Sequence, residues 1–253
     1  MKAMLLPSAL AADRYQYLTT FLVNGTVAID AGSLGLYGSP EDQSRVRHVF
    51  LTHAHMDHVA SLPIFLENVS DDSAHCPTVY APAEVLEVVR SDLLNDRVFP
   101  DFERLSRAGP PLVKLETLTP GRPVKVDGLS VTAVAVDHVV PTFGYVVSDA
   151  KSAFVFVTDT GPTDAIWELA RRTPNLSAVF LEVTFPEDQA WLAGVAKHLT
   201  PKLFAGEVRK LPAGIAVYAI HLKARCVEAV RAEIEALRLA QVTILEPGRE
   251  VKI

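Results

Sequence analysis

The sequence predicts an α/β (α+β) protein in which two packed β-sheets are sandwiched between helices. Short runs of β-branched and aromatic residues are grouped toward both ends of the chain. Segments with helical periodicity lie between and after these runs, as expected for helices that cover two sheets. The 253 residues, 49% of them hydrophobic and 21% charged, can bury a substantial core. We therefore expect one globular domain over residues 1–253.

The first half of the chain is predicted to supply mainly strands. Residues 1–12 faintly resemble a signal peptide, but Pro7 interrupts the apolar stretch, which favours a first core strand. Residues 19–30 predict two strands around Asn24-Gly25, a strong hairpin signal. A buried strand is predicted over 46–52, and a strand over 79–81 precedes a helix over 83–94.

The second half is predicted to mix strands and helices. Residues 123–136 indicate a hairpin around Asp127-Gly128, and Thr163 can cap a helix over 164–172. The other predicted strands are 144–147, 154–157, 178–181 and 215–220, and the other helices are 187–197, 201–210 and 223–238. A terminal β pair, 241–245 and 250–253, is predicted on either side of Pro247-Gly248.

Composition argues against several classes of protein. The net charge of −6 disfavours binding of extended nucleic acid by broad phosphate neutralisation, although a local basic pocket stays open. Cys76 and Cys226 match no Cys-x-x-Cys pattern, so we expect no disulfide and a reducing, cytoplasmic location. No apolar run approaches the roughly 20 residues that a membrane span needs. We expect a soluble protein.

A cluster of histidines carries the strongest chemical signal. Four potential metal ligands fall within six residues, directly after the apolar run Val49-Phe50-Leu51, in the segment His53-Ala54-His55-Met56-Asp57-His58. A strand that ends in a tight turn can aim such side chains at two neighbouring points, as a two-metal hydrolytic site requires. The cluster therefore predicts a dinuclear metallohydrolase.

Three more residues follow predicted strands in the same way, namely His138, Asp159 and His221. Any one of them alone would be better explained as a hydrogen-bonded rim residue or a turn residue. Together with the cluster they favour a metal site, because a strand-end carboxylate can bridge two cations. His48 and His75 match no spacing of this kind.

This ligand set resembles the signature of the metallo-β-lactamase superfamily, His-x-His-x-Asp-His followed by a distant His, Asp and His. The resemblance implies an αβ/βα four-layer sandwich with two divalent metal ions at one edge. It further implies one metal on His53, His55 and His138, the other on Asp57, His58 and His221, and Asp159 as the bridge. Zinc suits these ligand types best, with manganese or iron as alternatives.

Asp30 resembles the strand-end aspartate that braces the histidine-rich loop in this superfamily. Such a residue would orient a ligand imidazole or the turn backbone. An aspartate that initiates the turn at Gly32 is an equally good interpretation.

Several segments resemble the class II cyclic nucleotide phosphodiesterases, with related Glu and His positions in RNase Z. They are Leu181-Glu182-Val183-Thr184-Phe185-Pro186, His198-Leu199-Thr200-Pro201, Ile220-His221-Leu222-Lys223 and, more weakly, the insert 94–102. In that insert Phe99 replaces a frequent Trp. The resemblance implies hydrolysis of small 3′,5′-cyclic nucleotides (cAMP or cGMP) to 5′-nucleotides. An RNase Z-like RNA 3′-end endonuclease, or another hydrolase of this fold, is the alternative, and a homodimer stays open.

The implied mechanism uses the two cations to activate a bridging water. The departing alkoxide needs a proton, and His198 held by Glu182 is the expected general acid. Asp57, on the metal-binding loop, is counted with this pair among the catalytic residues. A helix-flanking role is the structural alternative for His198. Lys223 could meet a phosphate oxygen, but a solvated lysine is the more common case.

Overall fold

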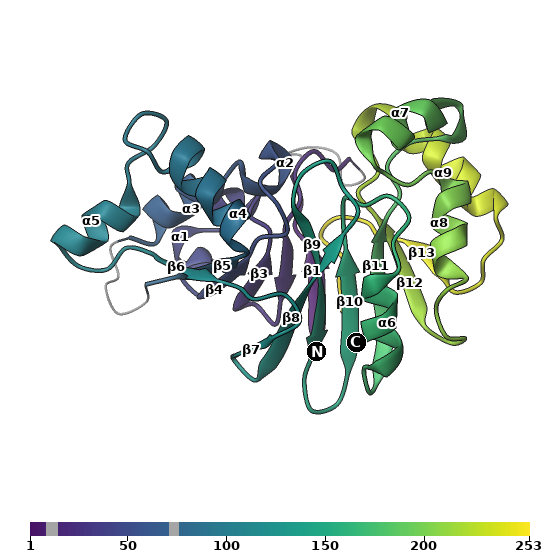
Figure 1. The fold of residues 1–253 in the computed structure, drawn as a ribbon, viewed down its shortest axis with the longest axis horizontal. Coiled ribbons are helices and arrows are strands. Elements are labelled where there is room, and N and C mark those ends of the chain that lie inside the picture. The colour runs from purple at the N-terminus through teal and green to yellow at the C-terminus, as the bar shows by residue number, and fades with distance from the viewer. Residues whose placement is uncertain (9–14, 71–75) are drawn as a thin grey trace.

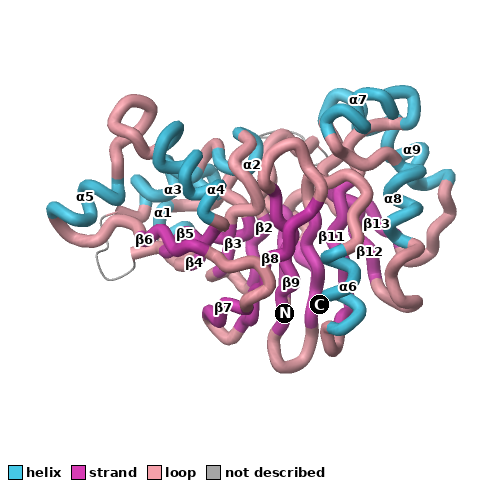
Figure 2. Tube along the Cα trace, viewed as in Figure 1, coloured by secondary structure: helices cyan, strands magenta, loops and turns pink. Residues whose placement is uncertain are grey.

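The computed structural model describes residues 1–8, 15–70 and 76–253 and contains two seven-stranded β-sheets that pack face to face (Figure 1). Helices lie on the outer flank of each sheet, so the layers run helix, sheet, sheet, helix (Figure 2). The predicted two-sheet sandwich is confirmed.

The two sheets share one plan, in which one half of each sheet is parallel and the other half is antiparallel. The first sheet has the order β14 (Glu250–Lys252), β1 (Lys2–Leu5), β2 (Phe21–Val23), β3 (Val27–Ile29), β4 (His48–Phe50), β5 (Thr78–Ala81), β6 (Lys114–Thr117). The second has the order β13 (Val242–Ile244), β12 (Ala216–Ile220), β11 (Leu176–Glu182), β10 (Ala153–Val157), β9 (Thr142–Ser148), β8 (Leu129–Val136), β7 (Pro123–Val126). The strands from β3 to β6 and from β10 to β13 run parallel.

Strand β10 shows how the sequence builds two cores. All five of its residues are buried, as expected for a strand covered on both faces. Because side chains alternate along a strand, Phe154 and Phe156 face the core between the sheets, whereas Val155 and Val157 face the helices of the second sheet. The ring of Phe21 from β2 lies 4.7 Å from that of Phe156, which joins the sheets.

The helices divide between the two flanks. On the side of the first sheet lie α1 (Pro40–Gln43), α3 (Leu62–Asn68), α4 (Ala83–Val88) and α5 (Phe102–Ala108), with the short α2 (Met56–Val59) above it (Figure 1). On the side of the second sheet lie α6 (Ala165–Arg172), α7 (Ala190–Ala196), α8 (Pro201–Val208) and α9 (Val227–Ala236).

The prediction of a terminal β pair was wrong, because the two strands belong to different sheets. β13 pairs with β12, whereas β14 pairs with β1. The turn at Pro247-Gly248 carries the chain from one sheet to the other. Alternation identifies a strand but not its partner, so an adjacent partner was the simplest prediction.

Some element boundaries also differ from the predictions. Helix α4 ends at Val88 and continues as a π-helical turn over Val89–Leu93, and a 3₁₀ turn over Ala224–Cys226 precedes α9. The N-cap of α6 is Asp164 and not Thr163. The backbone N–H of Thr163 instead donates to the Glu207 carboxylate at 3.3 Å. Helices α1, α2, α3 and α5 and strand β6 were not predicted.

Two expectations about composition can be compared with the structure. Cys76 and Cys226 are both free. Among the described residues, no helix is long and apolar enough to span a membrane. His75 and residues 9–12 of the N-terminal segment lie outside the described residues.

Candidate metal centre

The candidate ligands gather where parallel strands of both sheets end. His53 follows β4, Asp159 follows β10, Glu182 ends β11 and His221 follows β12. Carboxyl ends of neighbouring parallel strands meet at one edge of a sheet. The packed sheets therefore bring two such edges together beside α2, at the top of Figure 1.

Three residues at these strand ends have a left-handed backbone. Asp30, Asp159 and His221 have φ values of 61°, 43° and 61°. Aspartate tolerates this conformation better than most residues, but it is costly for histidine. Non-glycine residues keep such a backbone where the surroundings impose it, commonly at functional sites. Here the left-handed residue ends the strand and starts the turn that holds the side chain at the centre.

All seven predicted metal ligands lie together. His53, His55, His138 and Asp159 each offer one ligand atom within 4.8 Å of the others, and so do the members of a second group, Asp57, His58 and His221. Asp159 faces both groups, since its Oδ2 lies 3.4 Å from His53 Nε2 and its Oδ1 lies 3.3 Å from His58 Nε2. A third group joins His198 to Asp159 and His221.

Two buried nitrogen atoms indicate that this arrangement fits metal ions. Among the described residues, Nε2 of His53 and Nε2 of His58 are buried without a hydrogen-bond partner. A buried polar atom without a partner costs about 1–3 kcal/mol. Both atoms face Asp159, and a cation bound there would satisfy them together.

The buried carboxylate of Asp30 determines which ring nitrogen faces Asp159 in both these histidines. Asp30 is an acceptor for Thr52 N–H at 2.7 Å, for the Thr52 hydroxyl at 2.9 Å and for His58 Nδ1–H at 2.7 Å. The Thr52 oxygen, having donated its hydrogen, accepts from His53 Nδ1–H at 2.9 Å. Both imidazoles thus carry a hydrogen on Nδ1 and direct Nε2 toward Asp159. Asp30 makes the contact expected of a bracing residue, rather than only initiating a turn.

Glu182, at the end of β11 in the second sheet, orients two histidines in the same way as Asp30. The Glu182 carboxylate accepts from His198 Nδ1–H at 2.7 Å and from the Thr184 hydroxyl at 2.5 Å. The Thr184 oxygen in turn lies 3.0 Å from His221 Nδ1, from which it accepts. His221 therefore presents Nε2 to the centre, 3.2 Å from Asp159 Oδ1.

His138 is held by a backbone carbonyl, and His55 lies against it. His138 Nδ1 donates to the carbonyl of Lys197 at 3.1 Å, which leaves its Nε2 facing the centre. That Nε2 lies 3.4 Å from Nδ1 of His55, so His55 offers its Nδ1 to the same point.

Burial and neighbouring charges set the protonation states of the candidate ligands. Burial lowers the pKa of His53 to about 3, and the neighbouring His58 adds to this effect, so the imidazole is neutral at physiological pH. Burial opposes ionisation of Asp159, but the charges of His221 and His58 prevail and lower the pKa of its carboxyl well below the usual range. Burial disfavours protonation of His58, but the charges of Asp159 and Asp30 outweigh it and raise the pKa of this imidazole well above its usual value. A divalent metal, which binds neutral imidazole, would therefore displace a proton from this residue.

The pKa of His198, which is not one of the seven predicted ligands, is also raised. Burial disfavours its protonated form, but the charge and the hydrogen bond of Glu182 outweigh this effect and raise the pKa of the imidazole. The ring lies close to the ligands, with its Nε2 4.0 Å from Asp159 Oδ2. The pair can therefore hold a proton beside the metal site.

Sequence reasoning missed three contributors to this centre. Thr52 and Thr184 gave no signal, because a threonine at a strand end is ordinary. A lysine such as Lys223 is typically solvated, but its Nζ lies 3.0 Å from Asp57 Oδ2. Burial opposes ionisation of Asp57, but the hydrogen bond from His221 and the charges of its neighbours, Lys223 among them, lower the pKa of this carboxyl.

The insert 94–102 is occupied by its own contacts. The Asn95 side chain accepts from the N–H groups of Arg97 and Val98 at 3.0 and 2.9 Å. The ring of Phe99 packs 5.8 Å from that of Phe102. These contacts explain the local shape of the insert without a substrate.

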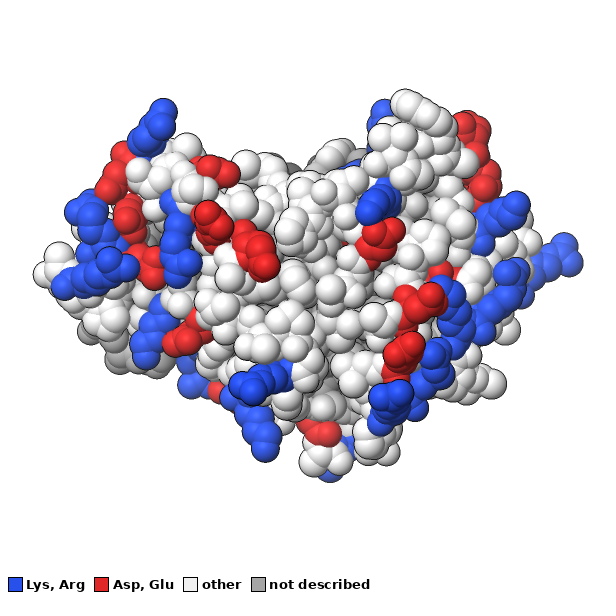
Figure 3. All heavy atoms as spheres, viewed as in Figure 1, with Lys and Arg blue, Asp and Glu red and all other residues white. Residues whose placement is uncertain are grey.

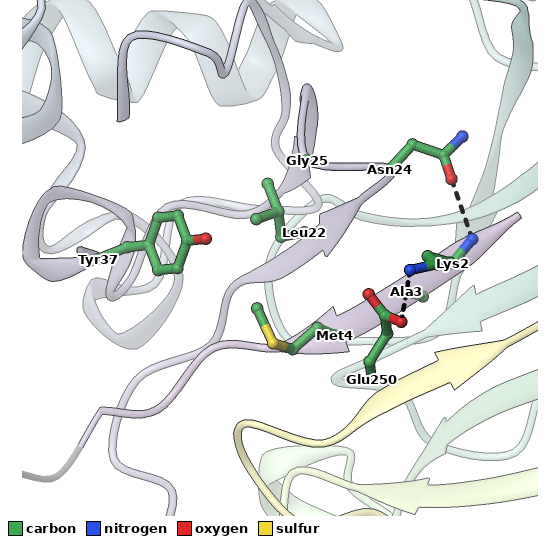
Figure 4. A pocket seen from close by; sticks show the side chains of 8 residues that line it. All are labelled: Lys2, Ala3, Met4, Leu22, Asn24, Gly25, Tyr37 and Glu250. Carbon is green, nitrogen blue, oxygen red and sulfur yellow. Dashed lines mark hydrogen bonds and ion pairs between the residues drawn. The ribbon is translucent and has the colours of Figure 1, made fainter. Parts of the chain in front are cut away.

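A separate hollow of about 300 Å³ lies between β1, β2 and Tyr37 (Figure 4). Its charged groups are paired with each other, since Lys2 Nζ lies 2.9 Å from Glu250 Oε1. It contains none of the candidate ligands.

Glycine is required where the Asp30 turn meets the metal loop. A Cβ at Gly32 would lie 2.0 Å from the carbonyl oxygen of Asp57 and 2.7 Å from the backbone nitrogen of Thr19. We expect Gly32→Ala to lower the free energy of unfolding by about 1–3 kcal/mol or more, because both neighbours are backbone atoms that cannot move alone. Thermal or urea unfolding measures this.

The matched control is Gly206→Ala in α8, where a Cβ meets no atom within 4 Å. That change should be neutral, or stabilise by up to about 1 kcal/mol, because alanine is the better helix former. Equal effects of the two substitutions would contradict the close approach at Gly32.

The chain is similar to several known proteins. The model of a family described as the beta-lactamase superfamily domain matches residues 24–222. A probable 3′,5′-cyclic-nucleotide phosphodiesterase from Yersinia pestis is 29% identical over 183 residues, which cover 66% of this chain and 51% of that protein. A ribonuclease Z from Mycobacterium bovis is 29% identical over 131 residues, covering 48% of this chain and 47% of that protein. The chain thus spans about half the length of these curated relatives.

A solved structure shows the same fold. Unliganded yeast PDE1 aligns with a TM-score of 0.79 at 14% sequence identity, covering 100% of this chain and 99% of that one. At this identity the likeness concerns the fold alone.

Proposed function

The chain belongs to the beta-lactamase superfamily, and we propose that it is a two-metal phosphodiesterase that hydrolyses 3′,5′-cyclic nucleotides to 5′-nucleotides. The observation that carries this proposal is the His198–Glu182 pair beside Asp159. A phosphodiester with an alkoxide leaving group needs a proton donor next to the metals, and this pair can supply one. The name of the Yersinia pestis relative, a probable 3′,5′-cyclic-nucleotide phosphodiesterase, supports the same class of substrate.

In this proposal each metal takes four protein ligands. One ion would bind His53, His55 and His138, the other would bind Asp57, His58 and His221, and Asp159 would be shared. When bound, the ions supply an activated water and neutralise charge on the phosphoryl oxygens. The imidazole-rich set suits zinc best, and manganese or iron also suit it.

The protein's own residues would then orient the substrate's leaving group and protonate it. Glu182 fixes the His198 ring through Nδ1, so a proton on Nε2 faces the centre. Transfer of this proton to the departing 3′ oxygen would leave a neutral imidazole and a 3′ hydroxyl. Lys223, paired with Asp57 at 3.0 Å, holds that ligand in place from outside the cluster.

The proposal predicts metal-dependent conversion of 3′,5′-cyclic AMP or cyclic GMP to the 5′-monophosphate, resolved by chromatography. Asp159→Ala should abolish both bound metal and turnover, because this carboxylate faces both ligand groups. Protein that cleaves bis(p-nitrophenyl) phosphate but yields no 5′-monophosphate from either cyclic nucleotide would refute the cyclic nucleotide assignment and keep the phosphodiesterase.

A second candidate is cleavage of RNA 3′ ends, since several relatives are named ribonuclease Z. On the face shown in Figure 3, basic and acidic side chains are interspersed on both flanks and the middle is largely uncharged. With a net charge of −6, this distribution favours a small substrate. Cleavage of a precursor tRNA, with no turnover of cyclic nucleotides, would favour the second candidate.

A further inference from the structure

A mostly apolar pocket of about 280 Å³ lies beside the metal centre, between α4 and the loop after β8. Its lining residues are Ala54, His55, Glu84, Val85, Val88, Val140 and Pro141. Val85 and Val88 come from α4, and Val140 and Pro141 come from the loop that follows His138. Short aliphatic side chains on two sides suit a flat, weakly polar group.

The pocket is continuous with the proposed metal site through His55. This residue lines the pocket, and its Nδ1 faces Nε2 of His138 at 3.4 Å. A substrate whose phosphate lies on the ligand cluster can therefore extend its other end into this pocket. For a nucleotide, that end is the base.

Glu84 gives the pocket its chemical selectivity. It is the one carboxylate in the lining, and it is exposed in the first turn of α4. Among the residues that the structure describes, it has no hydrogen-bond or ion-pair partner, so both oxygens are available to a ligand. A carboxylate accepts hydrogen bonds and cannot donate them. An acyl chain would leave this group unused.

We propose that this pocket binds the purine base of the substrate and that Glu84 selects guanine over adenine, an inference that rests on the proposed phosphodiesterase function. Guanine presents two adjacent donors, N1–H and the N2 amino group, which match the two oxygens of a carboxylate. Adenine presents the N6 amino group beside an acceptor nitrogen, which a carboxylate would repel. The preferred substrate is thus a guanine nucleotide.

The test compares kcat/KM for cyclic GMP and cyclic AMP in the wild type and in Glu84→Gln. The wild type should prefer cyclic GMP. The glutamine offers one donor and one acceptor, which suits adenine, so the ratio of cyclic GMP to cyclic AMP should fall at least about tenfold. Glu87→Gln is the matched control, because Glu87 is exposed on the same helix but does not line the pocket. It should leave the ratio unchanged.

A pocket-filling variant gives an independent measurement. Val88→Phe should raise KM for both cyclic nucleotides more than for bis(p-nitrophenyl) phosphate, which has no purine, and circular dichroism checks its fold. A wild type that prefers cyclic AMP, or a ratio that Glu84→Gln does not change, would overturn the assignment.

Failure of the proposed function can be distinguished from failure of the pocket. If no cyclic nucleotide is hydrolysed, inhibition of bis(p-nitrophenyl) phosphate cleavage by 5′-GMP and 5′-AMP tests the pocket directly. Stronger inhibition by 5′-GMP, lost in Glu84→Gln, would support the pocket on its own. Equal inhibition by both, or none, would overturn it.

Discussion

Replacing Asp30 with alanine is expected to weaken metal binding about 100-fold or more, although Asp30 is not itself a proposed ligand. Its carboxylate receives His58 Nδ1–H directly and His53 Nδ1–H through the Thr52 hydroxyl. These two imidazoles belong to different ligand groups. Loss of one carboxylate should therefore disturb both halves of the centre, whereas loss of a single ligand would act mainly on one. Titration with zinc against a competing chelator measures this.

Asp30 also has a left-handed backbone, which alanine tolerates poorly. A control substitution must therefore distinguish the effect of backbone strain from the effect of losing the carboxylate. Asp96 has nearly the same φ, 60° against 61°, and its partner Arg104 is exposed and outside the metal centre. Asp96→Ala should leave metal affinity unchanged. Asp30→Asn keeps the shape but offers one acceptor oxygen to three donors, so an intermediate loss is expected. Wild-type zinc affinity in Asp30→Ala would show that this carboxylate does not orient the ligands.

The sequence was sufficient to predict that the seven candidate ligands lie together, because several of them directly follow strand ends. His53, Asp159 and His221 each come shortly after the end of a strand. The apolar run that predicts the strand therefore also predicts where the side chain leaves the sheet. Parallel strand order then brings these ends together. Strand pairing across long distances lacks such a local signal, which is why β13 and β14 were assigned to each other.

The threonine relays could not be predicted for a different reason. Thr52 and Thr184 matter through the direction of one hydroxyl hydrogen, which depends on a carboxylate that lies 22 residues away in one case and two in the other. The same chemistry at the ends of two sheets gives a symmetric centre. Each half has one buried carboxylate, one imidazole hydrogen-bonded directly to it and one imidazole connected to it through a threonine hydroxyl.

The two halves differ in what the directly bound imidazole can do, and His198→Ala tests that difference. The neighbouring carboxylates raise the pKa of both imidazoles against the effect of burial, but the buried Nε2 of His58 belongs to a ligand group with Asp57 and His221, whereas His198 is not one of the seven proposed ligands and can give its proton to a substrate. We expect His198→Ala to lower turnover of a cyclic nucleotide by about 10²- to 10⁴-fold, because the departing alkoxide loses its proton donor. Bis(p-nitrophenyl) phosphate releases nitrophenolate, which needs no proton, so its hydrolysis should fall far less.

Metal content separates proton donation from ligand orientation in the same experiment. His198→Ala should retain its metal, because the seven proposed ligands and their supports remain. Glu182→Gln should lose metal as well as turnover, since Glu182 also accepts from Thr184, which positions His221. If His198→Ala slowed both substrates equally while its metal content stayed normal, His198 would not be the general acid, and its contact with Glu182 would serve only to support the fold around Asp159.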